Sequence, residues 1–215
     1  MERIICLLIG YACGLLQTGY LVGKIKHVDI RQEGSGNAGS TNAVRVMGWK
    51  AGAWTFLGDV LKCVGAIFLV RYLYRGSEML PLLSMYAGMG ATLGHNFPFY
   101  LRFKGGKGIA VLAGLVLSTG LMLVPIPLAA FLIAVIFTRY VSLGSLLASS
   151  LFFVEILIFG GLGQFHMAAA FQYELYILVL LLTVLAWYRH KDNIKRLLAG
   201  TENRFGSGKK KAVEQ

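Results

Sequence analysis

Charged residues are scarce in this sequence of 215 residues. Asp, Glu, Lys and Arg together make up 14% of it, and the mean hydropathy is +0.65. About 25% charged residues is usual in soluble domains. The composition therefore excludes an ordinary soluble protein and favours an integral membrane protein, with enough chain for one compact domain.

Cysteine is also rare, and no two cysteines have the CxxC spacing of a redox or zinc site. The three are Cys6, Cys13 and Cys63. All lie inside apolar runs, so we expect small buried thiols and no disulfide framework. The histidines, His27, His95, His166 and His190, show no metal-ligand spacing. We expect no metal and no cofactor.

Long apolar runs of roughly 17–25 residues predict membrane-spanning helices. They lie near residues 4–23, 52–72, 79–97, 109–124, 142–163 and 172–188. The stretch 125–138 is shorter and starts with Pro125 and Pro127. It is either a seventh span, since proline is tolerated in the first turn of a helix, or a re-entrant segment.

Basic residues outnumber acidic ones by 21 to 10, and their placement indicates topology. With seven spans, the segments 24–51, 98–108, 139–141 and 189–215 share one side and hold all but four Lys and Arg. The positive-inside rule makes that side cytoplasmic. The prediction is an all-α integral membrane protein of about seven transmembrane helices, with its N-terminus outside, its C-terminus cytoplasmic and no nucleic-acid partner.

Two features stand out inside the predicted spans: repeated small residues and one pair of charged residues. Small residues repeat four positions apart at Gly10/Gly14, Gly19/Gly23 and Gly90/Gly94, which predicts close helix approach. Asp59 and Lys62 lie three positions apart within a span. Charges at that depth are usually paired or functional, so they form either a structural ion pair or a direct contact to substrate.

Three polar clusters interrupt the apolar sequence. They are "RQEGSGNAGSTNAVRVMG" (31–48), "GHNFPFYLRFKGGKG" (94–108) and "RHKDNIKRLLAGTENR" (189–204). Each follows an odd-numbered predicted span, so all three belong on the cytoplasmic face and can converge there. We expect residues 1–205 to form the membrane catalytic domain, and 206–215 to form a basic, disordered cytoplasmic tail.

The first cluster is rich in hydroxyl, amide and backbone donors. These donors belong to Ser35, Gly36, Asn37, Gly39, Ser40, Thr41 and Asn42. Arg45 follows about one helical turn after Thr41. The alternative is a polar turn in which Thr41 or Asn42 caps the second span.

The second cluster has the chemistry of an anion site. Gly105, Gly106 and Gly108 leave backbone N–H groups unobstructed, Lys104 and Lys107 add positive charge, and the loop opens into the next span. It is not a Walker P-loop, because Gly108 stands where that motif has Ser or Thr. The alternative is a flexible cytoplasmic loop whose charge serves topology.

The third cluster places His190, Asn193 and Arg196 at helical spacings of three, so they share a face. The alternative is a basic helix resting on anionic lipid.

Missing motifs narrow the chemistry further. No His is followed five positions later by Asp, Ser35 does not lie in a G-x-S-x-G elbow, and the cysteines are too deep to be nucleophiles. A covalent enzyme intermediate is therefore not expected. What remains is a pocket for phosphate beside hydrocarbon, where positioning and preorganised donors supply the catalysis.

The three clusters resemble those of the bacterial membrane acyl-phosphate:glycerol-3-phosphate acyltransferases. The matching stretches are "GSGNAGSTN" (34–42), "GHNFPFYLRFKGGKG" (94–108) and "RHKDNIKRL--G-E" (189–202). The sequence departs from the family at Cys63, where Gly is usual, and at Ser40, where Ala is commoner; both departures should affect packing more than chemistry.

The resemblance implies that a long-chain acyl phosphate acylates the sn-1 hydroxyl of glycerol 3-phosphate. The products would be lysophosphatidic acid and inorganic phosphate, in the first acylation of phospholipid biosynthesis. Acyl phosphate as donor, rather than a thioester, agrees with the missing HxxxxD motif. The implied location is the bacterial cell membrane, with a cytoplasmic active site in a monomer whose partners are its substrates and the bilayer.

Roles for individual residues combine this resemblance with the chemistry of the side chains. Ser35, His95, Lys104 and Asn193 are the predicted catalytic residues. The predicted substrate-binding residues are Gly36, Asn37, Gly39, Thr41, Asn42, Arg45, Gly105, Gly106, Lys107, Gly108, His190 and Arg196. The proton acceptor is either His95 or the phosphate of the substrate, whose second pKa near 6 suits a base at neutral pH.

Two other classes of function need different features. A carrier for phosphorylated metabolites should show internal repeats and a site at the membrane midplane, whereas these clusters gather at one interface. A lipid-binding scaffold would need only the basic loops and tail, and it gives no reason for all three clusters together.

Overall fold

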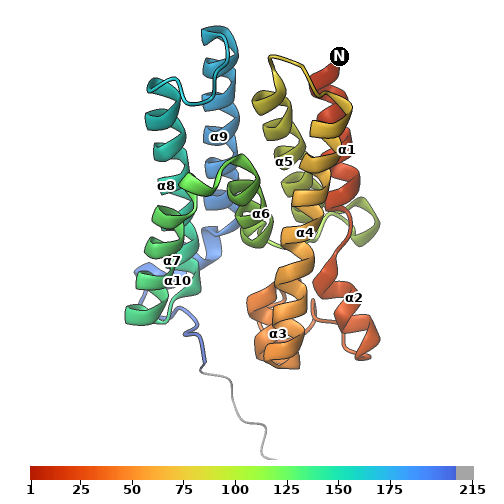
Figure 1. Cartoon of the computed structure of the whole chain (residues 1–215). Coiled ribbons are helices and arrows are strands. Elements are labelled where there is room, and N and C mark those ends of the chain that lie inside the picture. The colour runs from red at the N-terminus through yellow and green to blue at the C-terminus, as the bar shows by residue number, and fades with distance from the viewer. Residues whose placement is uncertain (207–215) are drawn as a thin grey trace, which may run out of the picture.

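The computed structural model describes residues 1–206, and that range is built from α-helices and two 3-10 turns, without a strand. The all-helical prediction is confirmed (Figure 1). The helices are α1 (Glu2–Gly14), α2 (Thr18–Ile25), α3 (Ser40–Met47), α4 (Trp49–Leu73), α5 (Leu80–Asn96), α6 (Ile109–Thr119), α7 (Pro125–Thr138), α8 (Val141–Gly161), α9 (Ala169–Arg189) and α10 (Lys191–Leu198), with η1 (Phe99–Leu101) and η2 (Leu121–Leu123). All but the first residue of the predicted tail 206–215 lies outside the described range.

Five stretches are long and apolar enough to cross a membrane. They are Glu2–Ile25, Trp49–Leu73, Leu121–Thr138, Val141–Gly161 and Ala169–Arg189. The other two predicted spans correspond to α5, with 17 residues, and α6, with 11. The protein is therefore a multi-pass membrane protein, and large apolar side chains cover much of its outer surface.

The first predicted span, 4–23, corresponds to the candidate span Glu2–Ile25, but its helix is interrupted at residues 15–17 between α1 and α2. Gln17 lies in this break and is only 1% exposed. Its Nε2 lies 3.3 Å from the carbonyl of Gly94 and 3.1 Å from that of His95, both at the end of α5. A polar side chain thus ties the break to the beginning of the second cluster.

The boundary between the fourth and fifth spans also differs from the prediction. The fourth run was expected to continue to residue 124, but α6 ends at Thr119, and Gly120 follows in an extended conformation with φ 169°. The short stretch 125–138 is helix α7, with a proline in its first turn as expected. Together with η2 it gives an apolar segment of 18 residues.

Helices α1 and α5 approach each other through their glycines. A Cβ added at Gly10 would lie 2.0 Å from the carbonyl oxygen of Ala87, and one at Gly90 would lie 2.0 Å from that of Leu7. The predicted close approach is confirmed for these helices. Gly19 packs instead against the loop that contains Ala38, because a Cβ added at Gly19 would lie 2.1 Å from the carbonyl oxygen of Ala38.

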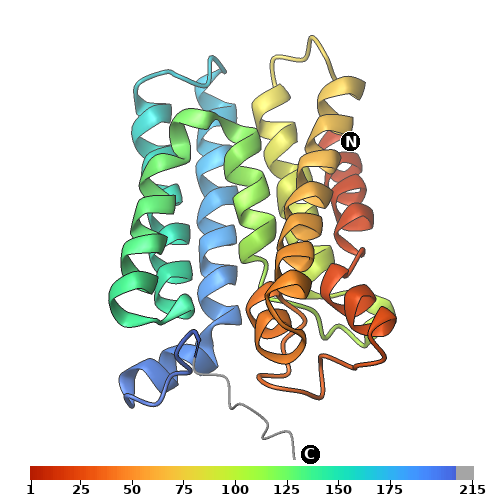
Figure 2. The ribbon, with the colours of Figure 1, turned by 60° about the horizontal axis from the view of Figure 1, so that its bottom comes forward.

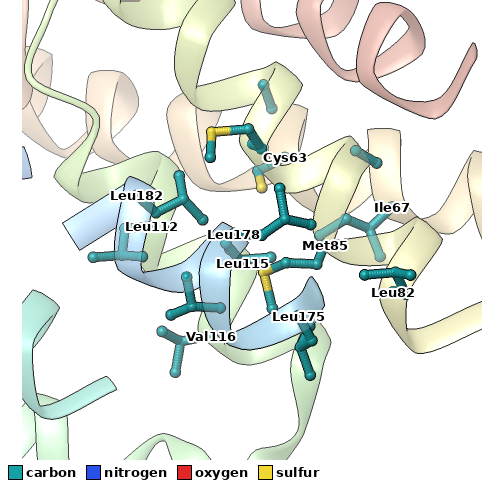
Figure 3. Packing of buried hydrophobic residues seen from close by; sticks show 14 of the residues in the cluster. Cys63, Ile67, Leu82, Met85, Leu112, Leu115, Val116, Leu175, Leu178 and Leu182 are labelled. Carbon is teal, nitrogen blue, oxygen red and sulfur yellow. The ribbon is translucent and has the colours of Figure 1, made fainter. Parts of the chain in front are cut away.

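The apolar core lies mainly between α4, α5, α6 and α9 (Figure 3), and α1, α8 and η2 also contribute buried residues to it. Labelled members of this cluster are Cys63, Ile67, Leu82, Met85, Leu112, Leu115, Val116, Leu175, Leu178 and Leu182. Cys6 and Cys63 are buried thiols, as expected, whereas Cys13 is partly exposed. This core holds the helices whose ends carry the polar clusters.

The polar clusters lie at one end of the bundle. Helices α2, α3 and α10 are at that end, and the N-terminus and the α4–α5 connection are at the other (Figures 1 and 2). The common location predicted for the three clusters is confirmed.

Candidate active site

The three clusters surround two adjoining cavities, of about 860 Å³ and about 150 Å³. Residues from all three clusters line both cavities. Five residues are common to the two, namely Ser35, Asn37, Lys107, Asn193 and Arg196. The predicted convergence is therefore correct, and these five residues mark the junction.

Every predicted site residue except Gly106 lines at least one cavity. The larger cavity contains Ser35, Gly36, Asn37, Lys104, Gly105, Lys107, Asn193 and Arg196. The smaller cavity contains Ser35, Asn37, Gly39, Thr41, Asn42, Arg45, His95, Lys107, Gly108, His190, Asn193 and Arg196. Gly106 does not line either cavity; it packs against the imidazole ring of His95.

The larger cavity is strongly basic. Its cationic residues are Arg31, Arg102, Lys104, Lys107, Arg189, Lys191 and Arg196, and its acidic residues are Asp29 and Asp192. The bidentate contact with Arg31 lowers the pKa of Asp29. The smaller cavity combines polar groups with apolar ones, including Phe56 of α4 and Phe131 of α7.

Asn42 shapes the first cluster from inside α3. Its Oδ1 accepts from the backbone N–H of Ser35 at 2.9 Å, and its Nδ2 donates to the carbonyls of Ile30 and Glu33 at 3.0 Å. Arg45 also donates to this Oδ1, at 3.3 Å. The alternative in which Asn42 caps the second span is wrong, because α3 is a separate helix and α4 begins after it.

The glycine loop differs from the expected open cradle. The N–H of Gly105 donates to the carbonyl of Asn96 at 3.2 Å, and that of Gly106 donates to the carbonyl of His95 at 3.1 Å. Nη2 of Arg189 donates to both loop carbonyls, at 3.0 and 2.8 Å. The expectation that all the loop amides are free is therefore wrong for Gly105 and Gly106.

The end of the loop does open a helix toward the site. Gly108 is the N-cap of α6, with φ 83°, and it lines the smaller cavity together with Ile109 and Ala110. The first N–H groups of a helix have no partner within that helix and carry its positive dipole end. This helix start has the geometry of the anion site that the sequence predicted.

Lys107 contacts the third cluster directly, because its Nζ donates to Oδ1 of Asn193. Burial lowers the pKa of Lys107 to about 8; the carboxylate of Glu202 opposes that shift, and the charges of Arg196 and Arg189 add to it. The ammonium therefore loses its proton more readily than an exposed lysine would.

Glu202 is the functional candidate that the sequence analysis missed, although it is the last letter of the third motif. Its Oε1 accepts from Nδ2 of Asn193 at 2.7 Å and from the hydroxyl of Ser142 at 3.1 Å. Its Oε2 accepts from Nε of Arg196 at 2.8 Å. One buried carboxylate thus orients two predicted site residues and links them to α8.

His190 is 3% exposed and held in one tautomer. Its Nδ1 lies 2.7 Å from the carbonyl of Ala186, which only accepts hydrogen bonds, so Nδ1 carries the proton. Burial and the nearby charge of Lys107 lower the pKa of His190 to about 4. The neutral ring therefore offers Nε2 as an acceptor at the smaller cavity.

Asp59 and Lys62 of α4 form the buried ion pair considered from the sequence. Nζ of Lys62 lies 2.8 Å from Oδ1 of Asp59, and both side chains are at most 2% exposed. Nζ also lies 2.8 Å from Nδ1 of His95 and 2.7 Å from the carbonyl of Leu16. The pair is confirmed, and it contacts a predicted catalytic residue.

In the part of the chain that the structure describes, no group of three or more His, Cys, Asp or Glu side chains is arranged to hold a metal ion.

Known proteins resemble this chain over almost its whole length. A family model described as glycerol-3-phosphate acyltransferase matches residues 4–200. Proteins named glycerol-3-phosphate acyltransferase from Thermoanaerobacter sp. (strain X514) and Shouchella clausii (strain KSM-K16) are 40% and 42% identical, each over 96% of this chain and 97% of the relative.

Two crystal structures of PlsY (YgiH), described as an integral membrane glycerol 3-phosphate acyltransferase, share the fold. The glycerol 3-phosphate form has a TM-score of 0.82 at 30% identity, and the lysophosphatidic acid form has 0.80 at 29%. Each comparison covers 96% of both chains.

Proposed function

The chain belongs to the glycerol-3-phosphate acyltransferase family, and we propose that it transfers a long-chain acyl group from acyl phosphate to the sn-1 hydroxyl of glycerol 3-phosphate. The hydroxyl oxygen forms an ester bond to the acyl carbon while the bond between that carbon and the donor phosphate oxygen breaks. The products are lysophosphatidic acid and inorganic phosphate. The reaction is the first acylation of phospholipid biosynthesis.

One observation carries the proposal: three clusters from distant parts of the chain meet around two adjoining cavities at one end of a membrane bundle. The larger cavity is basic and suits a soluble phosphate. The smaller one adds Phe56 and Phe131 to its polar wall. Such a lining suits an amphiphile whose chain stays in the bilayer.

Charge neutralisation falls to four basic residues. Arg45 lines the smaller cavity and Lys104 lines the larger one. Lys107 and Arg196 line both cavities and therefore lie at the junction between them. Both substrates carry phosphate, and their mutual repulsion must be offset before the hydroxyl can approach the acyl carbon. Fixed cations perform this task without reorganising during the reaction.

Hydrogen-bond donors position the acyl donor. Ser35, Gly36 and Asn37 hold its phosphate, while the start of α6 after Gly108 stabilises charge on the carbonyl oxygen. Asn193 and His190 orient glycerol 3-phosphate from the other side. The proton of the attacking hydroxyl passes to a phosphate oxygen of glycerol 3-phosphate itself, because a group with a pKa near 6 accepts protons at neutral pH.

The placement proposed for the enzyme is the bacterial cell membrane, crossed seven times. The N-terminus lies outside, and the C-terminus and active site face the cytoplasm. Residues 1–205 form the catalytic domain, which acts as a monomer. The cytoplasmic end then carries the basic segments that the positive-inside rule places there.

The test is acyl transfer by the purified protein in lipid. Glycerol 3-phosphate is supplied with palmitoyl phosphate, palmitoyl-CoA or palmitoyl carrier protein, and both phosphate release and lysophosphatidate are measured. Turnover with palmitoyl phosphate alone, abolished by Lys104→Ala, is the expected result. Turnover only with a thioester contradicts the proposed donor, and passage of labelled glycerol 3-phosphate into proteoliposomes without acylation contradicts the enzyme.

A further inference from the structure

The buried pair Asp59–Lys62 has no role in the steps above, yet the ammonium nitrogen of its lysine lies close to three polar groups. An ammonium group carries three N–H bonds. Three acceptors surround Nζ of Lys62: Oδ1 of Asp59 at 2.8 Å, the carbonyl of Leu16 at 2.7 Å, and Nδ1 of His95 at 2.8 Å. They come from α4, the α1–α2 break and the end of α5.

The protonation of this group follows from charge balance. Asp59 is 1% exposed, and removing one partner of a buried ion pair is strongly destabilising because it leaves an uncompensated charge. A charged Lys62 beside a charged Asp59 keeps the pair neutral overall. An ammonium group can donate hydrogen bonds but cannot accept one. The contact between Lys62 and His95 is therefore donated by Nζ of Lys62 and accepted by Nδ1 of His95.

The tautomer of His95 follows in turn. A neutral imidazole has one protonated nitrogen and one acceptor. With Nδ1 occupied as acceptor, the proton lies on Nε2. The charged groups near this ring are Asp59, Lys62 and Arg189, and the net charge of the first two is zero.

We propose that Lys62, held by Asp59, is a positioning residue for acyl transfer that locks His95 in its Nε2–H tautomer. The inference rests on the proposed function and deepens it. His95 then offers the smaller cavity a hydrogen-bond donor and cannot take the hydroxyl proton at Nε2.

The same contact braces the glycine loop. The ring of His95 lies against Gly106, where an added Cβ would be 2.0 Å from Nε2. The backbone of His95 accepts the N–H of Gly106 at 3.1 Å. A ring held from Nδ1 by Lys62 therefore supports the loop that delivers Lys107 to the site.

The tautomer is measured first, on the whole protein without substrates. Histidines labelled with ¹⁵N give separate signals for protonated and unprotonated ring nitrogens, and the signals missing in His95→Gln identify His95. At neutral pH we expect a protonated Nε2 and an unprotonated Nδ1. A proton on Nδ1 overturns the proposal, and this result does not depend on which acyl donor the enzyme uses.

Activity is measured on matched variants. Lys62→Met leaves Asp59 uncompensated and should lower both the melting temperature and kcat. The double variant Asp59→Asn/Lys62→Met removes both charges, so we expect it to regain thermal stability while kcat stays at least about tenfold low, with KM for glycerol 3-phosphate changed less than kcat. Lys26→Met, at an exposed lysine outside both cavities, is the control.

Two results separate positioning from simple support. If the double variant regains kcat together with stability, the pair is only structural and the proposal fails. His95→Gln can still place an amide N–H near the position of Nε2, so we expect a modest loss of kcat; a loss of about 100-fold or more, with binding intact, indicates a histidine base. If wild type and all variants lack turnover with acyl phosphate, the proposed donor fails while the tautomer measurement stands.

Discussion

Asn193 donates from Nδ2 to the carboxylate of Glu202 at 2.7 Å, and this contact decides which way its amide points. With Nδ2 occupied, Oδ1 faces Lys107 and accepts from its ammonium. Glu202 lies beyond α10, the last helix of the described chain. The segment after that helix therefore helps to line the smaller cavity of the candidate active site.

Glu202→Gln tests this role. The amide can replace one acceptor, but it loses the charge-assisted contact to Arg196 and leaves Asn193 free to turn. We expect kcat to fall by about 100-fold, the size of effect that follows a small misplacement, and the free energy of unfolding to drop by about 1–3 kcal/mol. Glu78→Gln, at an exposed acid away from both cavities, is the matched control. Unchanged kinetics in Glu202→Gln would remove Glu202 from the site.

Gly90→Ala tests the contact between α1 and α5. The new Cβ would meet the carbonyl oxygen of Leu7 at 2.0 Å, and the backbone there has no flexible end to move aside. Overpacking of this kind costs about 1–3 kcal/mol. Gly65→Ala, an exposed glycine of α4 with nothing within 4 Å of its added Cβ, should instead stabilise the helix by about 0.5–1 kcal/mol. Thermal unfolding in detergent compares them, and equal melting temperatures would contradict the packing.

Gly106→Ala should damage activity more than stability. Its Cβ would lie 2.0 Å from Nε2 of His95, and that ring is held at Nδ1 by Lys62. The loop must therefore move and take Lys107 with it. We expect kcat/KM for glycerol 3-phosphate to fall by about 100-fold, again with Gly65→Ala as control. Activity close to wild type would mean that the loop does not depend on the ring.

The location of the site could be predicted because it depends on local signals. The apolar runs indicate the order of the spans. Each polar cluster follows one of these spans, so the number of spans before it predicts which clusters share a side of the membrane. The residue types inside the clusters indicated phosphate chemistry in the same way. Residues such as Ser35, Arg45 and Asn193 were found from their own surroundings in the sequence.

The parts that were missed depend on distant partners. The break after α1 is held by Gln17, whose acceptors are carbonyls at the end of α5. The amides of Gly105 and Gly106 looked free because glycine has no side chain. Their acceptors are the backbone carbonyls of Asn96 and His95, about ten residues earlier in the chain. In the sequence, Glu202 is only one acidic residue in the basic third cluster, and its role appears once Asn193 is placed beside it. Such pairings appear only once the helices are packed.

The pH dependence of the reaction should reveal Lys107. Its pKa is lowered to about 8 from 10.5, chiefly by burial, so the ammonium that neutralises phosphate is lost as the pH rises through 8. We expect kcat/KM to fall above about pH 8, and to fall below about pH 6 as the substrate phosphate becomes protonated. Lys107→Arg keeps its charge at all these pH values and should lose the alkaline fall, even where its overall rate is lower.

The contribution of Lys107 to the free energy of unfolding, measured as the difference between wild type and Lys107→Arg, should move in the opposite direction over the same interval. Between pH 8 and 10.5 the unfolded chain keeps a proton on Lys107 that the folded chain has released, so this group makes the folded state more stable as the pH rises. Activity that falls while this stability difference rises separates titration of Lys107 from alkaline unfolding. Parallel loss of kcat/KM and of this stability difference, or an alkaline limb that persists unchanged in Lys107→Arg, would assign the limb to another group.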